Sequence, residues 1–161
     1  MEQNNSSARG RVEAVLAAAG VDVDIRVFPA GTRTAADAAA AIGCQVAEIA
    51  KSIVLRAAKT GDVVVIVTSG SNRVDEGKVA RHLGQPVARA DADFVKARTG
   101  FTIGGVAPVG HLHTPLMLID ADLMQFDYIW AAAGTGDSVF RLTPAALRTL
   151  TSAPVADVKQ E

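Results

Sequence analysis

The sequence predicts an α+β fold built on a mostly antiparallel or mixed sheet. Strand and helix patterns are interleaved along the chain, and β-hairpin signals outnumber strand–helix–strand crossovers. The length of 161 residues, 49% of them hydrophobic, suits one compact domain with its own core. A doubly wound dinucleotide-binding fold is the alternative, weakened by the lack of a G-x-G-x-x-G motif at a helix start. We expect one domain over residues 1–161, with loose termini at about 1–9 and 159–161.

Three elements are predicted before residue 45. Apolar residues recur at helical spacing over 8–19 and stop at Gly20, which predicts a first helix. Apolar and charged residues alternate over 23–27, which predicts a short strand. Thr34 is a good N-cap for an Ala-rich second helix that ends at Gly43.

The middle of the chain contains the strongest hairpin signal. The β-rich runs KSIVLRAA from Lys51 and VVVIVTSG from Val63 are joined by a short turn that contains glycine. The segments 74–83 and 91–99 have helical patterns, and each is followed by a glycine that can end a helix.

The last third of the chain begins with a glycine-rich segment, FTIGGVAPVGH, at 101–111. The apolar run PLMLID at 115–120 and the strand pattern YIWAAA at 128–133 follow it. Thr143 and Pro144 then predict the start of a final helix, with threonine as N-cap and proline at the first helical position.

Composition and charge exclude several classes of protein. The chain has 16 Lys and Arg against 17 Asp and Glu, without a basic tail or stripe, so we expect no DNA partner. The segment 71–100 holds six basic and four acidic residues, for which a solvated helix face is the favoured explanation. No apolar run approaches the ~20 residues of a membrane span, and the N-terminus lacks a signal-peptide core. We therefore expect a cytoplasmic protein without a membrane partner.

Two glycine-containing segments are candidates for binding loops. Clustered glycines in GGVAPVG at 104–110 let a backbone approach a ligand closely and leave N–H groups free, and Pro108 makes the path rigid. A tight turn between strands explains this segment equally well. WAAAGTGDS at 130–138 follows a strand in the same way, so the two loops could face each other across a cleft.

A few side chains could carry chemistry. Lys51 opens a strand, where a solvated strand end is the common case, although a lysine over a pocket would suit an ester carbonyl, a carboxylate or a phosphate. His111 and His113 form an H-x-H pair, but His82 is distant in sequence, so we expect no zinc site. Cys44 is interpreted as a small core residue, and it cannot form an internal disulfide alone.

The order of several motifs resembles the YbaK/EbsC/ProX family of aminoacyl-tRNA editing domains, over about residues 10–158. The matching pieces are T-x-x-x-A-A from Thr34, Lys51-Ser52 at the strand start, GGVAPVG at 104–110 and AAGTGDSVFRLTPAAL at 132–147. This resemblance implies a compact barrel-like sheet flanked by helices, related to the insertion domain of bacterial prolyl-tRNA synthetase. It also implies hydrolysis of the ester of mischarged tRNA, mostly tRNA(Pro) carrying a small amino acid such as alanine or cysteine.

The resemblance also implies roles for individual residues. Lys51 would anchor the substrate, and the N–H groups around Gly104 and Gly105 would stabilise the oxyanion while a positioned water or ribose hydroxyl attacks. No metal or cofactor would be needed. The implied substrate-binding residues are Phe28, Thr34, Ser52, Pro108, His111, Gly134 and Asp137.

This sequence departs from the family pattern at three positions. Ala107 stands where cysteine-clearing members have serine, which leaves the amino acid open. His111 could recognise the substrate or only cap the loop, and Asp137 could bind an amino group or lie on the rim.

The expected partners are the acceptor end of mischarged tRNA and prolyl-tRNA synthetase. A non-catalytic module that binds a small ligand or an aminoacyl end in the same cleft is the alternative. Lys51 together with the G-x-x-x-P loop favours the enzyme.

Overall fold

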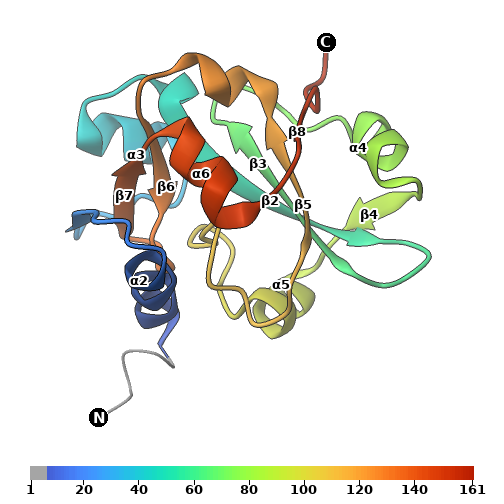
Figure 1. The fold of residues 1–161 in the computed structure, drawn as a ribbon, viewed down its shortest axis with the longest axis horizontal. Coiled ribbons are helices and arrows are strands. Elements are labelled where there is room, and N and C mark those ends of the chain that lie inside the picture. The colour runs from blue at the N-terminus through green and yellow to red at the C-terminus, as the bar shows by residue number, and fades with distance from the viewer. Residues whose placement is uncertain (1–6) are drawn as a thin grey trace.

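The computed structural model describes residues 7–161, which build one eight-stranded sheet with helices around it (Figure 1). The α-helices are α2 (Ala8–Ala18), α3 (Ala35–Ile42), α4 (Glu76–Leu83), α5 (Ala92–Thr99) and α6 (Pro144–Thr151). The strands are β1 (Ile25–Val27), β2 (Ile49–Ala57), β3 (Val63–Ser69), β4 (Val87–Arg89), β5 (Leu116–Asp120), β6 (Ile129–Ala132), β7 (Ser138–Leu142) and β8 (Val155–Ala156). Two 3-10 helices, η1 (Val46–Glu48) and η2 (Ala121–Gln125), precede β2 and follow β5.

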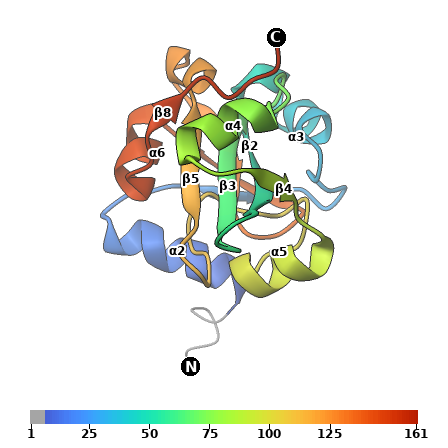
Figure 2. The ribbon, with the colours of Figure 1, turned by 90° about the vertical axis from the view of Figure 1, so that its right-hand side faces the viewer.

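The sheet combines antiparallel and parallel pairs. Its strands follow the order β1-β7-β6-β2-β3-β5-β8, and β4 pairs with the far end of β2. The pairs β1–β7, β7–β6, β2–β3 and β2–β4 are antiparallel, whereas β6–β2, β3–β5 and β5–β8 are parallel. The predicted α+β fold with a mixed, mostly antiparallel sheet is therefore confirmed. Within residues 7–161 the path of paired strands has two ends, so the sheet is not closed into a barrel. Figure 2 shows β8, β5, β3 and β2 side by side.

The helices begin close to the positions that their capping residues predict. Thr34 and Thr143 are N-caps, and their hydroxyls accept hydrogen bonds from first-turn N–H groups at 3.0 and 3.1 Å. α4 begins at Glu76, later than predicted, because Asp75 caps the helix while Val74 forms an antiparallel bridge instead. The short strands β4, β7 and β8 were not predicted from the sequence.

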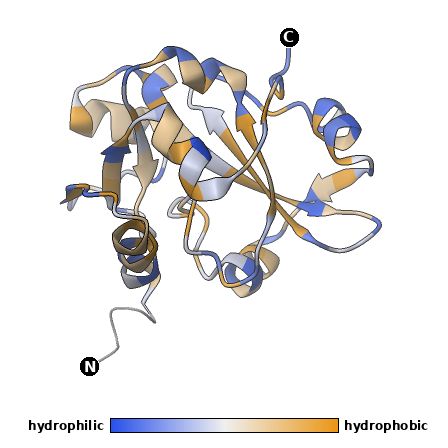
Figure 3. Cartoon of the chain, viewed as in Figure 1, coloured by the Kyte–Doolittle hydropathy of each residue, from blue (hydrophilic) through white to orange (hydrophobic). Residues whose placement is uncertain are grey.

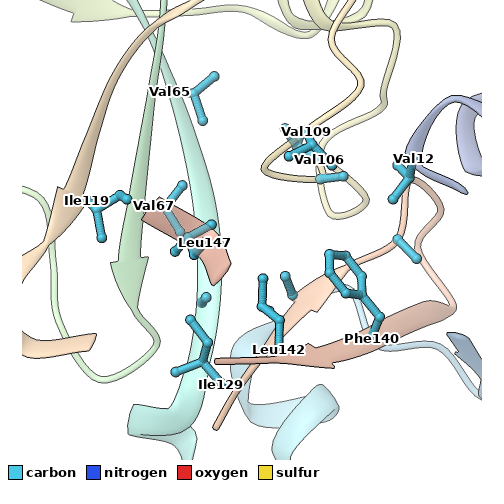
Figure 4. Packing of buried hydrophobic residues seen from close by; sticks show 14 of the residues in the cluster. Val12, Val65, Val67, Val106, Val109, Ile119, Ile129, Phe140, Leu142 and Leu147 are labelled. Carbon is cyan, nitrogen blue, oxygen red and sulfur yellow. The ribbon is translucent and has the colours of Figure 1, made fainter. Parts of the chain in front are cut away.

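Three buried clusters hold the sheet and helices together. The largest joins α2, α6, the sheet and the 104–110 segment, as Figure 4 shows for Val12, Val106 and Leu147. The second lies between α4 and the strands β2, β3 and β5, and the third lies under α3 around Trp130. All of β3 is buried, which explains its continuous apolar run. Figure 3 shows the central strands as mostly hydrophobic and α4 as mostly hydrophilic.

The C-terminal residues are not loose, contrary to expectation. Lys159 pairs with Val74, and its ammonium donates a hydrogen bond to an Asp122 carboxylate oxygen at 2.9 Å. The N–H of Gln160 donates to the carbonyl of Arg73 at 2.8 Å. Residues 7–9, at the N-terminal end that was expected to be loose, are also ordered, because Ser7 caps α2 and the helix begins at Ala8; residues 1–6 lie outside the described range.

The described helices are all too short or too polar to cross a membrane.

Candidate functional site

Two adjoining cavities share residues of strand β2 and of the glycine-rich segment at 101–111, which we call the glycine loop. We name them the small chamber, of about 340 Å³, and the large chamber, of about 530 Å³. The residues that border both chambers are Lys51, Ser52 and Ile53 from β2 and Ile103, Gly104 and Val106 from the loop. The predicted catalytic residues Lys51 and Gly104 therefore belong to the same wall, where the two chambers meet.

The chambers differ in character. The small chamber is bordered by Arg33 and its neighbours at 32–35, which lead into α3. Its other walls are mostly small or apolar side chains that include Ala38, Trp130, Ala131 and Val139. The large chamber is bordered by the charged residues Arg73, Glu76 and Arg89, together with Val95 and Gln160.

Lys51 is half-buried and has little to bind within the protein. Its ammonium donates one long hydrogen bond, of 3.4 Å, to the carbonyl of Gly70. It takes part in none of the ion pairs found among residues 7–161. Burial lowers the pKa of the Lys51 ammonium, repulsion from Arg73 lowers it further, and attraction by Asp120 opposes both. The lysine is thus left with donors for a ligand, and the expectation of a simple solvated strand end is not met.

Asp120 holds the turn at residues 69–72, in which the Gly70 carbonyl accepts the hydrogen bond from the Lys51 ammonium. This carboxylate is 1% exposed, and one of its oxygens accepts hydrogen bonds from Thr68 Oγ1 at 2.8 Å and from the Ser69 N–H at 3.0 Å. The same oxygen accepts from the side-chain amide of Asn72 at 2.8 Å. Sequence reasoning missed Asp120, and the only available signal was an acid at the end of the apolar run PLMLID.

Ser52 Oγ is a buried polar atom without a protein partner among the described residues. Buried hydroxyls are nearly always hydrogen-bonded, so this one is available to a substrate group in the cleft. Ser52 follows Lys51 directly and borders both chambers.

The two glycine loops pack against each other and do not face each other across a cleft. A Cβ at Gly105 would come within 2.8 Å of the Thr135 carbonyl carbon, so glycine is needed for this close approach. Arg33 covers both loops, because a Cβ at Gly104 would meet its Cβ at 3.1 Å and one at Gly136 would meet its Nε at 2.5 Å.

Some backbone N–H groups of the 104–110 loop donate hydrogen bonds within the protein, and others do not. The Gly105 N–H donates to the Thr102 carbonyl at 2.9 Å, so Gly105 has a packing role and not the expected oxyanion role. No described residue accepts a hydrogen bond from the backbone N–H of Gly104 or Val106, and both residues border the chambers. The candidate oxyanion donors are therefore Gly104 and Val106.

His111 and Pro108 lie away from Lys51. They border a third hollow together with Val15 of α2 and Leu150 of α6. We call this side of the loop, next to α2, its rear face, and the side next to Lys51 its front face. The His111 Nε2 lies 2.8 Å from the Ala107 carbonyl oxygen, and burial lowers the pKa of this histidine. Of the two roles considered, the structure supports a loop cap and not a substrate contact.

Three other predicted binding residues, Phe28, Gly134 and Asp137, make contacts within the protein outside the two chambers. The Phe28 N–H donates to the Asp137 carbonyl at 2.7 Å, while the Asp137 carboxylate accepts from Thr135 within its own turn at 2.8 Å. Gly134 has a φ of 105°, and a Cβ there would lie 2.8 Å from the Ala8 carbonyl oxygen of α2. Among the predicted binding residues, Thr34 and Ser52 border a chamber next to Lys51, whereas Phe28, Gly134 and Asp137 do not.

The other candidate side chains are not brought together. The described residues contain no cluster of three or more groups suited to a metal ion, and His113 is exposed while His111 is partly buried. Cys44 is partly buried and packs against the cluster under α3, and burial raises the pKa of its thiol.

Helix α2 holds the rear of the glycine loop, which sequence reasoning also missed. The Arg11 guanidinium donates to the Gly110 carbonyl at 3.0 Å and to the Gly100 carbonyl at 2.7 Å. It also lies over the Phe101 ring, 5.0 Å from the centroid. One side chain thus joins both ends of the segment that carries Gly104.

Residues 29–150 match the family described as "Aminoacyl-tRNA editing domain". The chain belongs to this editing-domain family. The matched range includes the shared wall of the two chambers and both glycine loops, whereas α2 and the C-terminal tail lie outside it. The predicted resemblance to the YbaK/EbsC/ProX family is therefore confirmed.

Relatives and solved structures agree with this editing-domain membership. The chain is 34% identical over 125 residues to "Uncharacterized protein YwhH" of Bacillus subtilis, covering 77% of this chain and 78% of that protein. It is 27% identical over 126 residues to "Putative Cys-tRNA(Pro)/Cys-tRNA(Cys) deacylase EbsC" of Enterococcus faecalis, covering 78% and 76%. A solved structure described as "a putative trans-editing enzyme for prolyl tRNA synthetase" has 41% identity, a TM-score of 0.89 and coverage of 96% and 98%.

Proposed function

We propose that this protein is a trans-acting deacylase that hydrolyses the ester of mischarged tRNA, with tRNA(Pro) carrying alanine or cysteine as the first substrates to test. The observation that carries the proposal is the shared wall between the chambers. There, a lysine without an ion pair and a buried hydroxyl without a hydrogen-bond partner lie beside a glycine loop with unused N–H groups. Family membership and the names of the similar proteins support it.

The chemistry needs positioned donors more than a strong nucleophile, because an aminoacyl ester is already activated. A water molecule, guided by the neighbouring ribose hydroxyl, attacks the ester carbonyl carbon, and the carbonyl oxygen becomes an oxyanion. The N–H groups of Gly104 and Val106 and the charge of Lys51 are the donors for that oxyanion. Collapse breaks the bond to the ribose oxygen, which takes the proton from the attacking water and leaves a free amino acid and a free tRNA end.

The small chamber suits a small amino-acid side chain. Ala38, Ala131 and Val139 present short apolar groups, and Trp130 is only 8% exposed at the same border. Such walls favour the small side chains of alanine or cysteine through contact area.

The test is a panel of tRNA(Pro) charged with alanine, cysteine, serine, threonine or proline. We expect release of alanine or cysteine at rates well above the uncatalysed hydrolysis, and no release of proline. The variant Lys51→Ala, assayed in parallel, identifies the site. If the wild-type protein binds these tRNAs but releases none of the amino acids, the non-catalytic binding module replaces the enzyme.

A further inference from the structure

Unpaired cations gather at the large chamber. Lys51, Arg73 and Arg89 border it, and Glu76 is the one carboxylate among the described residues that line it. None of the three cations takes part in an ion pair within residues 7–161. The whole protein has a net charge of −1, so this is a local concentration of positive charge. The arginines belong to the basic segment 71–100, so the explanation by a solvated helix face does not fit these two.

Both arginines are attached to fixed backbone. The carbonyl of Arg73 accepts the Gln160 N–H at 2.8 Å, and the neighbouring Val74 is bridged to Lys159. Arg89 pairs with Leu55 between β4 and β2. Hydrogen bonds and strand pairing therefore hold the backbones of both arginines at the border of one chamber, so that only the side chains lose entropy when they hold a ligand.

The anion that this chamber takes follows from the chemistry of the proposed substrate. The carboxyl group of an ester-linked amino acid has no charge, so the anions nearest to the ester are the phosphates of the RNA end. Arginine binds phosphate through paired N–H groups. A volume of about 530 Å³ lies in the range that ligand sites occupy, and the small chamber is walled mainly by apolar side chains.

We propose that the large chamber binds the phosphodiester of the 3′-terminal nucleotide of RNA through Arg73 and Arg89. This inference rests on the proposed function, since the ester then lies on the wall between the two chambers. The amino acid extends into the small chamber, and the ribose and its phosphate extend into the large one.

The test measures binding of an uncharged, 5′-phosphorylated cytidine–cytidine–adenosine trinucleotide by calorimetry. We expect Arg73→Ala and Arg89→Ala each to weaken binding about tenfold or more, as loss of a charge-assisted hydrogen bond does. Each variant should also lower the slope of log affinity against log salt by roughly one. Arg81→Ala is the matched control, because Arg81 is exposed on α4 and borders neither chamber. Arg33→Ala tests the reverse orientation, with the phosphate at the small chamber.

The outcomes separate this site from the proposed function, because the trinucleotide contains no ester. Loss of binding in both chamber variants supports the site even if the charged-tRNA panel shows no deacylation. Unchanged binding in those variants, absence of binding by the wild type, or a loss confined to Arg33→Ala would overturn it. If deacylation is found, KM for the charged tRNA should rise in Arg73→Ala and Arg89→Ala while kcat changes little. Thermal unfolding of each variant shows whether its fold is retained.

Discussion

The front and rear faces of the 104–111 loop differ in how fully their polar groups are satisfied. On the rear, the carbonyl groups of Ala107 and Gly110 lie at hydrogen-bond distance from the His111 ring and the Arg11 guanidinium. On the front, Gly104 and Val106 keep unused N–H groups beside Lys51. The rear face stabilises the loop, and the front face is left for a ligand. Substitutions on the two faces should therefore affect different measurements.

The largest effect is expected from Lys51→Ala on the front face. Deacylation should fall by at least ~10²-fold, because a charge close to the developing oxyanion is lost. The melting temperature should change little, since Lys51 makes only one long hydrogen bond within the protein. Single-turnover assays and thermal unfolding check this, with the exposed Lys59→Ala as control. A near-normal rate would remove Lys51 from the site.

Gly104→Ala should lower kcat by about tenfold or more with a smaller change in KM. The added methyl meets Arg33 at 3.1 Å, and the φ of 93° strains any other residue by ~1 kcal/mol or more, so the loop must shift its donors. Gly61→Ala is the control, because Gly61 has a φ of 76° and open space around it. If both variants lose only stability, the tight-turn interpretation of the loop is preferred.

Arg11→Met on the rear face should reduce the free energy of unfolding by about 2 kcal/mol, since the carbonyl groups of Gly100 and Gly110 lose a charged donor. Urea unfolding measures this loss. At temperatures well below the unfolding transition, kcat/KM should stay within about threefold of wild type. A large fall in kcat at unchanged stability would contradict the division between the two faces.

A smaller effect concerns the pH dependence of stability through His111. Burial lowers its pKa in the folded state below the usual 6.5, so the unfolded chain binds more protons under acid conditions. The contribution of this group to stability is complete above pH 6.5 and is lost as the pH falls through the folded-state pKa. His111→Gln should flatten this part of the curve of unfolding free energy against pH. Equal slopes for wild type and His111→Gln would be the contrary result.

No effect is expected from metal removal. Activity should survive exhaustive chelation, and metal analysis of the purified protein should find no stoichiometric zinc. One tightly bound zinc per chain together with chelator-sensitive turnover would contradict the mechanism built on Lys51 and Gly104.

The sequence predicted features that depend on neighbouring residues, and it failed where distant segments meet. The β2–β3 hairpin and the caps at Thr34 and Thr143 are local, so their patterns were sufficient. Strand β7 was not singled out, because SVFRL gains its role only by pairing with β6 and β1. The position of His111 could not be predicted, because it lies on the side of the loop where α2 packs. That packing joins residues far apart in the sequence, such as Arg11 and Gly110.

The same distinction applies to the site residues. Lys51 and the loop that contains Gly104 were singled out from residue types, and Ser52 was added through the family resemblance. The structure brings all three to one wall. The different roles of Gly104 and Gly105 depend on a single turn hydrogen bond to Thr102, which residue types alone do not reveal. The role of Arg73 and Arg89 could not be predicted without the structure. The C-terminal residue Gln160 holds the backbone of Arg73, and the pairing of β4 with β2 places Arg89 at the same chamber.

The parallel pairing of β2 with β6 has a consequence for how the protein folds. It joins Ile49 to Trp130, so a long stretch of chain must close before this central pair of strands can form. Proteins with many such distant pairings fold slowly. The small chamber takes walls from both strands, so it cannot exist in a fragment that ends before β6. In refolding experiments, recovery of the proposed deacylation should therefore coincide with the last structural phase and not precede it.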